Sequence, residues 1–481
     1  MTSSPQCRRF YRDRASREHL VALGALPIEM GWCVGEALLV PFLMTLNLPS
    51  YLASLVWLLN PILGTFMQPW CGGLSDNCTS DWGRRKPFLI IFSAMAALGV
   101  FLIVFSLWFG ELLSGLCGSS KSISIVIVFV GFGLMDISLD LLLTPTRALL
   151  NDNAQSDEDL HRINNLYTSF AVLGRICGFV ICTFLPDSVI AYMGGNRFFA
   201  CLLINLTVLG GCMAAVVSIA DEKNQGDSQQ LASHGDISWR DLPREFAVLW
   251  VMQFGGWLVT CNFCFFFSSY CAFCVFGGTD VHGTNFNNGV LFATFGFVIQ
   301  AFISLFVNLA LPFLNKNLGT GRVYCIAELL GSIAMSLTAI LRDKESTIVL
   351  ISICGLMYPV HISNAFVLLE TLPSLKHSTM RNRGLLNGYM NNAMVYAQIT
   401  VAVLAAAQNY FSSKQEPMSC GTISSVAIFV LTVDCFLLVC FPKALLLPTI
   451  NTSHRQVRLC KNGVIDEATP LRETAALLYK K

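Results

Sequence analysis

Runs of about 20 apolar residues recur along the whole chain and restrict what it can fold into. A helix needs about 20 apolar residues to cross the hydrocarbon core of a bilayer. Only 13% of the 481 residues are charged, whereas soluble domains have about 25%. Backbone polar groups in hydrocarbon must be paired within the chain, so such runs form helices. The sequence therefore predicts an all-α membrane protein with twelve transmembrane helices, near residues 20–46, 51–72, 88–110, 122–150, 164–185, 198–220, 245–271, 287–314, 322–341, 346–370, 384–408 and 423–442.

The polar segments between these runs divide the chain into two halves and orient it. A central polar loop, 221–243, separates six helices in 20–220 from six in 244–442. If the terminal tails, 1–19 and 443–481, are cytoplasmic, most of the 31 Lys and Arg residues fall on the cytoplasmic side. Lys and Arg concentrate in the cytoplasmic loops of membrane proteins. The bias therefore predicts that both termini and the central loop are cytoplasmic.

Two sets of six helices joined by a polar loop are typical of secondary transporters, in which substrate binds between the halves near the bilayer midplane. A membrane enzyme would need a nucleophile–base pair or a metal site, and no Cys/His spacing in the sequence indicates one. We therefore expect neither an enzyme nor a bound metal or cofactor. The sequence has no basic patch interleaved with aromatic residues, so nucleic acid is not an expected partner. A channel with an oligomeric pore stays open as an alternative.

Charged residues inside the apolar runs point to proton coupling. Asp136 and Asp140 lie in the run 122–150, one helical turn apart, and Arg175 lies within 164–185. Each such charge costs about 2.5–3.5 kcal/mol to insert at the bilayer centre. Desolvation favours the neutral form of a carboxyl group, which lets it bind a proton. We predict that these three residues couple protons to transport and that Arg175 pairs with one of the two aspartates. A purely structural ion pair is the alternative.

A second charged cluster lies between the second and third predicted helices. Residues 72–88 read GGLSDNCTSDWGRRKPF, which places Asp76 across a short loop from Arg84 and Arg85. Such charges can pair in one transporter state and separate in the other, so we predict a gating role for all three. The alternative is that the arginines only anchor the cytoplasmic ends of the helices.

This segment resembles the cytoplasmic loop motif of the major facilitator superfamily, in the long form SD-x-C-x-S-x-x-GRR-x-P. That form is typical of plant sucrose transporters and of their animal relatives, solute carrier family 45, in the glycoside-pentoside-hexuronide branch. The first two predicted helices (29–70), GTGRVY (319–324) and RGLLNGYMNNAMVYAQ (383–398) also resemble the family. The fourth helix resembles the animal members in its spacing of Asp136, Asp140, Pro145, Arg147 and Asp152. The resemblance extends the predicted gating residues to Arg147, Asp152 and Arg322.

The resemblance implies the major facilitator fold, with two six-helix bundles, and symport of protons with sucrose or a related sugar by alternating access. The expected partners are the sugar, protons and the lipid bilayer. One departure concerns the seventh helix, where the family often has Thr-Asp and this chain has Ser268 and Ser269. A transporter of a different organic solute is therefore one alternative. A non-transporting membrane regulator of organelle pH is the other.

A sugar site needs polar groups for hydroxyls and flat aromatic rings for the sugar faces. The alternative role of intramembrane amides is hydrogen bonding between helices. His361 is a further polar group in the tenth helix, and we expect Glu328 at a packing seam. The candidate substrate-binding residues are Trp32, Glu36, Gln68, Asn262, Gln300, Asn364, Asn391 and Gln398.

The C-terminal tail contains ETAALL at 473–478. The segment resembles an acidic dileucine sorting signal, formed by Glu473, Leu477 and Leu478. We therefore expect sorting adaptors as possible further partners of the tail. The plasma membrane and an endosomal or lysosomal-type vesicle membrane are the two predicted locations.

Overall fold

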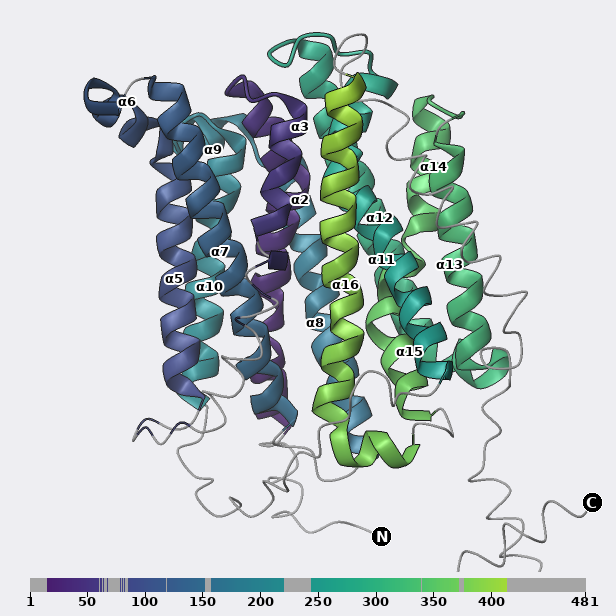
Figure 1. Cartoon of the computed structure of the whole chain (residues 1–481). Helices are drawn as coiled ribbons and strands as arrows, with labels where there is room; N and C mark the ends of the chain where they lie inside the picture. The colour runs from purple at the N-terminus through teal and green to yellow at the C-terminus, as the bar shows by residue number, and fades with distance from the viewer. Residues whose placement is uncertain are drawn as a thin grey trace, which may run out of the picture.

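All the regular elements in the described part of the chain are helical (Figure 1). The first set of helices comprises α2 (Ala25–Thr45), α3 (Ser50–Ala53), the 3-10 helix η1 (Ser54–Leu58), α5 (Lys86–Val104), α6 (Ser106–Cys117), α7 (Ser120–Asn151), α8 (Asp157–Phe184), α9 (Asp187–Tyr192) and α10 (Arg197–Ile219). The computed structural model describes residues 15–59, 61, 62, 64, 67, 78, 80, 82, 85–117, 119–151, 157–219, 244–338, 340–371 and 376–412.

The second set follows the central polar loop. It comprises α11 (Arg244–Tyr270), the π-helical turn η3 (Cys271–Val275), α12 (Thr284–Leu318), α13 (Thr320–Leu337), α14 (Lys344–Cys354), α15 (Met357–Thr371) and α16 (Lys376–Ser412). In Figure 1 the end of the molecule that carries α6, α9 and α14 is at the top, and we call it the upper end.

Nine helices in the described residues are long and apolar enough to cross a membrane. Each of them overlaps one of the predicted spans. Helix α13 overlaps a tenth, 322–341, although it is not among the nine. The predicted spans 51–72, in large part, and 423–442, entirely, lie outside the described residues. Twelve spans and cytoplasmic termini stay predictions.

In two of the turns between long helices, a single residue explains where the helix begins or ends. Gly319 follows α12 with φ of 90°, a left-handed conformation that glycine adopts without strain. Asp343 precedes α14, and its side chain accepts a 2.9 Å hydrogen bond from the amide of Ser346. This is an N-cap, and the bond holds the pKa of Asp343 below its ordinary value. Both turns therefore have identifiable causes in the sequence.

Glycines bring helix backbones into contact inside the first set. A Cβ on Gly99 of α5 would lie 2.6 Å from the carbonyl oxygen of Gly131 and from the amide nitrogen of Met135, both on α7. Side chains larger than hydrogen would separate these two helices. Small residues have the same role in helix pairs of membranes generally, because close approach improves van der Waals packing. The α5–α7 pair therefore forms a rigid outer part of this half.

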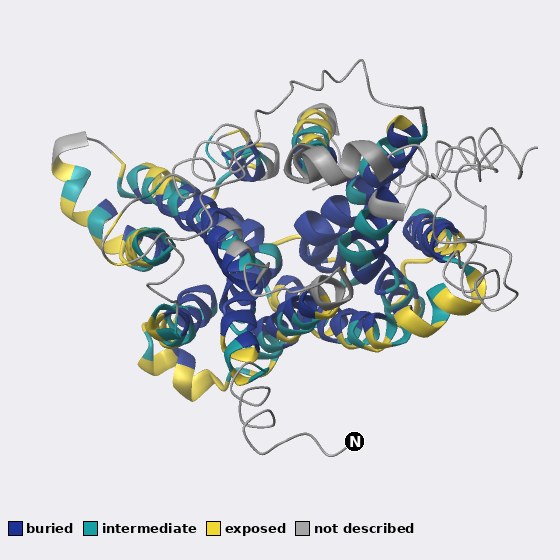
Figure 2. Ribbon diagram, turned by 90° about the horizontal axis from the view of Figure 1, so that it is seen from below, coloured by how far each residue is buried: buried dark blue, intermediate teal, exposed yellow. Residues whose placement is uncertain are grey.

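Burial divides the molecule into a central seam and an outer surface (Figure 2). Buried residues gather between the two sets of helices, where the rings of Phe179 on α8 and Phe297 on α12 stack at 4.7 Å. Large apolar side chains point outward, such as Phe306, Leu309 and Phe313 on α12, with exposed fractions of 64%, 64% and 68%. Such a surface is unfavourable in water. It fits the acyl chains of a bilayer.

Candidate functional site

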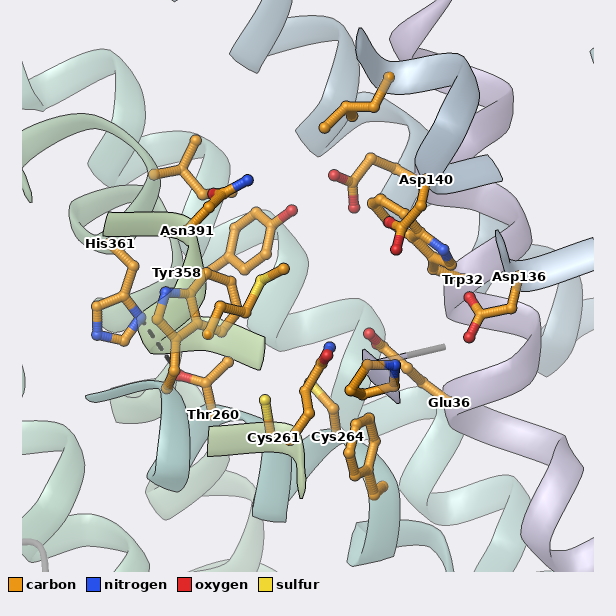
Figure 3. A pocket seen from close by; sticks show the side chains of 18 of the residues that line it. Trp32, Glu36, Asp136, Asp140, Thr260, Cys261, Cys264, Tyr358, His361 and Asn391 are labelled. Carbon is orange, nitrogen blue, oxygen red and sulfur yellow. Dashed lines mark hydrogen bonds between the residues drawn. The ribbon is translucent and has the colours of Figure 1, made fainter. Parts of the chain in front are cut away.

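A cavity lies between the two sets of helices (Figure 3). Its empty volume of about 1160 Å³ includes the part that is open to solvent. Figure 3 shows Trp32, Asp136 and Asp140 on one side, opposite His361 and Asn391. Both sets of helices therefore contribute polar groups and aromatic rings to the same space, which can hold a small polar molecule.

Eight of the residues predicted from the sequence line this cavity. In the part of the chain that the structure describes, no group of three or more His, Cys, Asp or Glu side chains is placed to hold a metal ion. Asp136 and Asp140 are 6% and 7% exposed on α7. The eight predicted residues are Trp32, Glu36, Asp136, Asp140, Arg147, Arg175, Asn391 and Gln398.

Three other candidates lie away from the cavity in this structure. Asn262, Gln300 and Asn364 are all buried, and none is among the lining residues. Asn364 on α15 exchanges two hydrogen bonds with Asn315 on α12, at 2.8 and 3.0 Å. For Asn364 this is the interhelical bonding that was the alternative role of an intramembrane amide.

Two further candidates in the described part of the chain lie outside the cavity. Arg85, just before α5, is half-buried, and the side chain of Arg322 on α13 is exposed. Neither lines the cavity in this structure. Their gating roles stay predictions. The candidates outside the described residues are Gln68, Asp76, Arg84, Asp152, Glu473, Leu477 and Leu478.

Arg175 is held at the interface of α8 and α2 by two flanking glycines. A Cβ on Gly174 would overlap the carbonyl oxygen of Leu26, and one on Gly178 would lie 3.0 Å from that of Met30. The backbones of α2 and α8 therefore touch on both sides of Arg175, whose side chain is 3% exposed. The spacing of Gly174 and Gly178 is the small-xxx-small pattern of membrane helix pairs. It was a sequence signal for this contact.

The ion pairs of Arg175 go to α2, so the prediction that it pairs with Asp136 or Asp140 on α7 is wrong. Its Nη2 donates to Oε2 of Glu36 at 2.9 Å, and its Nη1 donates to Oε2 of Glu29 at 3.5 Å. The two glutamates are seven residues apart and share one face of α2. The physical reason for the correction is the glycine contact, which turns this face of α8 toward α2.

The same guanidinium reaches across the seam to the second set of helices. Its central carbon lies 4.4 Å from the ring centroid of Tyr358 on α15, and Nη2 lies 3.9 Å from Sγ of Cys264 on α11. The first contact is a cation–π interaction, which is strongest where water is excluded. A second contact between the halves is the stack of Trp57 on Phe265, with ring centroids 4.0 Å apart. Arg175 therefore connects helices from both halves.

The wall formed by the second set contains a hydrogen-bonded network. His361 on α15 lies with its Nδ1 3.4 Å from Oγ1 of Thr260, and its Nε2 contacts Oε1 of Glu328. The backbone carbonyl of His361 accepts a 3.2 Å bond from Gln253, whose Oε1 accepts a 2.6 Å bond from Tyr324. This network fixes the position of His361 in the cavity wall.

Sequence reasoning did not assign several lining residues to a site. Glu29 and Tyr358 surround Arg175, and Trp57, Trp257 and Thr260 line the same space. Aromatic residues are frequent in every apolar run, so composition alone does not show which of them face a cavity. Glu29 had a usable signal, because its spacing of seven from Glu36 places both acids on one helix face.

Long apolar helices arranged around a central cavity that polar and aromatic side chains line are typical of a multi-pass membrane transporter. The family model described as MFS/sugar transport protein matches residues 20–375. The chain therefore belongs to the MFS/sugar transport protein family, and it is a transporter of the major facilitator type and not an enzyme.

Two sequence relatives and one solved structure agree with this family. The chain is 24% identical to "Sucrose transport protein SUC4" of Arabidopsis thaliana over 433 residues, covering 82% of this chain and 84% of that protein. It is 25% identical to "Sucrose transport protein SUT1" of Oryza sativa subsp. japonica over 468 residues, covering 85% of each chain. The crystal structure of nucleoside transporter NupG covers 88% of this chain and 98% of its own, with a TM-score of 0.53 and 14% identity. At that identity the likeness shows the fold.

Proposed function

We propose that this protein is a secondary active transporter that couples proton movement to the translocation of sucrose or a related sugar by alternating access. The observation that carries the proposal is the cavity, which combines buried acids on one wall, amide side chains on the other and aromatic rings on both. The two relatives named as sucrose transport proteins support sucrose as the first substrate to test. The animal members of solute carrier family 45 remain the proposed branch.

The proposed architecture has two six-helix bundles, 20–220 and 244–442, joined by a cytoplasmic loop at 221–243, with cytoplasmic tails. The upper end in Figure 1 then faces the outside of the cell or the lumen of a vesicle. The disulfide-bonded Cys274, in η3 at this end, supports the orientation, because disulfides persist in oxidising compartments. The dileucine-like segment of the tail would direct the protein to vesicle membranes through sorting adaptors.

The structure fits the inward-open state of such a cycle. Aromatic contacts join α8 to α12 toward the upper end, at Phe179–Phe297 and Phe184–Phe295. The cavity reaches Arg147 near the lower end of α7 and Phe366 on α15. In this state a sugar bound between the halves would leave toward the cytoplasm.

The proposed proton site is Asp136, alone or shared with Asp140. Both carboxyl groups are buried and face the cavity, so a proton can reach them from solvent. Two acids one turn apart hold the first proton more tightly than either would alone, and the titration belongs to the pair. Arg175 keeps its charge throughout the cycle, and we assign it to holding α2, α8 and the opposite half together at the seam.

Sugar binding would use the tryptophans and amides around these acids. Trp32 on α2 and Trp257 on α11 offer flat faces from opposite halves, while Asn391 and Gln398 of α16 offer donors and acceptors for hydroxyls. Substrate contact with both halves would favour their closure around the sugar, because a ligand shifts the population toward the state that it binds best.

Vesicle transport tests this function directly. In vesicles with an imposed pH gradient, sucrose should accumulate and carry protons with it. Asp136→Asn should abolish gradient-driven accumulation and keep sucrose exchange at equal pH, since exchange needs no net proton release. Asp343→Asn, which changes an exposed acid in the turn before α14, is the matched control and should behave like wild type. Normal accumulation by Asp136→Asn would disprove its coupling role.

A sugar panel in the same assay addresses the alternatives. A transporter of a different organic solute would show proton movement with that solute and none with sucrose. A membrane regulator without solute flux would show none with any member of the panel.

A further inference from the structure

A buried carboxylate and imidazole lie together in the second wall of the cavity, apart from the aspartates of α7. Glu328 on α13 and His361 on α15 are 1% and 0% exposed, and Oε1 of Glu328 contacts Nε2 of His361. Figure 3 shows His361 opposite Asp136 and Asp140. The two halves therefore each place ionisable groups at the cavity.

The surroundings of this pair are closely packed. A Cβ on Gly256 of α11 would overlap Nε2 of His361 and both carboxylate oxygens of Glu328, so the helix backbone passes directly over the pair. Trp257 covers the imidazole with its ring centroid 5.3 Å away, and Tyr324 lies at 6.3 Å on another side. Only a glycine at position 256 allows this arrangement.

The contact between Nε2 and the carboxylate requires a proton. An imidazole nitrogen and a carboxylate oxygen both have lone pairs, so one of them must carry hydrogen for the two to bond. The second oxygen of Glu328, Oε2, is buried and has no hydrogen-bond partner in the described structure. Glu328 can accept this bond from Nε2–H whether the imidazole is neutral or charged.

The other imidazole nitrogen faces a group that suits both protonation states. Nδ1 of His361 lies 3.4 Å from Oγ1 of Thr260, which also lines the cavity. A hydroxyl can donate or accept. It donates to Nδ1 when the imidazole is neutral, and it accepts from Nδ1–H when the imidazole is charged. By rotating, the Thr260 hydroxyl can therefore bond to Nδ1 in both protonation states.

Few other ionisable groups approach this pair among the described residues. Helix α11 presents uncharged Gln253, Trp257 and Thr260 with the thiol of Cys261, α13 adds Tyr324, and α16 presents uncharged Asn391. Tyr358 lies one turn away on α15 itself. The groups of the opposite wall are Glu29, Glu36, Asp136, Asp140, Arg147 and Arg175.

We propose that Glu328 and His361 form a second proton-binding site, so that each transport cycle moves two protons, one on each half. This inference rests on the proposed proton-coupled function. The carboxylate stays ionised, Nδ1 takes up the proton from the cavity with Thr260 as its neighbour, and the proton returns to solvent when the cavity opens on the other side. A second proton strengthens the coupling. The limiting ratio of sugar concentrations that two protons can drive is the square of the ratio that one proton can drive.

The test is the ratio of protons to sugar in vesicles that contain the full-length protein. Initial proton influx is measured with a trapped pH dye, and sucrose influx is measured with radiolabel. Wild type should move two protons per sucrose, and the double variant Glu328→Gln/His361→Gln should move one. At zero membrane potential, the limiting accumulation per unit of pH gradient should fall from about 100-fold to about 10-fold, because each proton contributes a factor of ~10 per pH unit.

Removing both members of the pair avoids leaving one buried charge without its partner, which would itself destabilise the protein. Sucrose exchange at equal pH verifies that the double variant is folded. A wild-type ratio of one, or a double variant that keeps the wild-type ratio, would overturn the second site and leave the proposed function intact. Wild type that takes up sucrose without any protons would overturn both.

A second measurement uses the unsubstituted pair and does not depend on a folded double variant. Trp257 covers His361, and a protonated imidazole quenches the fluorescence of a neighbouring indole. Wild-type emission should change when the pH is varied across the range in which the protein transports sucrose, and the difference between wild type and Trp257→Phe isolates this component. A component that stays flat across that range contradicts the site.

Discussion

The two walls of the cavity each bury a basic side chain with a carboxylate, and they differ in whether the basic group can exchange its proton. On the first wall Arg175 pairs with Glu36 and Glu29 and also touches the opposite half. On the second wall His361 contacts the carboxylate of Glu328. Arginine keeps its proton at all accessible pH values, whereas histidine titrates near neutrality. Burial of a charge pair is therefore compatible with two different roles, a permanent connection and an exchangeable proton site.

Removal of the permanent cation should have the largest effect. Arg175→Met leaves two glutamates buried without a counter-charge, and losing one partner of a buried pair costs about 3–5 kcal/mol. We expect a matching loss of stability to thermal unfolding in detergent and loss of transport. The triple variant Arg175→Met/Glu29→Gln/Glu36→Gln should recover much of the stability. If the single variant is as stable as wild type, the pair does not hold the seam.

Alanine substitution of one glycine in each wall should have the next largest effect, and the cost should differ between the two walls. Gly174→Ala forces a methyl group onto the backbone of Leu26, whereas Gly256→Ala meets the ends of two side chains. Overpacking typically costs about 1–3 kcal/mol, and we expect Gly174→Ala at the upper end of this range and Gly256→Ala below it. Gly210→Ala on α10, where a Cβ would meet nothing within 4 Å, is the control for thermal unfolding. The reverse order would contradict a rigid α2–α8 contact.

The contact across the seam should have a smaller effect. Tyr358→Leu removes the ring beneath the guanidinium of Arg175 and leaves its ion pairs in place. Desolvated cation–π contacts contribute up to about 2 kcal/mol. Because the contact joins the halves in this state, we expect faster opening of the seam, measured as a raised sucrose exchange rate, with little change in thermal stability. An unchanged exchange rate would remove this contact from the proposed cycle.

The smallest expected effect is the pH dependence of the turn at Asp343, which lies outside the membrane-spanning helices and serves as a reference for the buried groups. Its pKa is lowered by the hydrogen bond from Ser346. A lowered pKa means that the ionised carboxylate stabilises the folded turn. This contribution is complete above its ordinary value of 3.8 and is lost as pH falls through the lower, folded value. The protection factor of the Ser346 amide, which corrects for the intrinsic pH dependence of exchange, should therefore be constant between pH 5 and 8. It should fall only under more acidic conditions, and this fall should be absent in Asp343→Asn.

The sequence predicted the long apolar helices of the described chain, because they depend on local composition, and eight of the residues that line the cavity. Asp136 and Asp140 were recognisable as costly residues in an apolar run, and the structure places both at the cavity. The partner of Arg175 was not predictable from composition. It depends on which face of α8 meets α2, and Gly174 and Gly178 determine that face.

Buried amides show the same limit. Asn364 and Asn391 look equivalent in sequence, as single amides within apolar helices. In the structure Asn364 bonds to Asn315 between helices, whereas Asn391 lines the cavity. Glu328, expected at a packing seam, lies behind His361 and in contact with it. Periodicity shows which residues share a helix face, but the neighbouring helix decides whether that face meets protein, lipid or the cavity.

The ring stacks at the seam bear on how the halves can move past one another. Trp57 lies flat on Phe265 with 4° between the ring planes, and Phe179 lies on Phe297 with 9°. Parallel rings attract over a broad range of lateral offsets, since offset stacks are as favourable as centred ones or more so. Directional hydrogen bonds in the same places would break with a small displacement. The two stacking contacts can therefore persist through a small lateral displacement of the rings. They keep the halves in contact while the relative tilt of the halves changes.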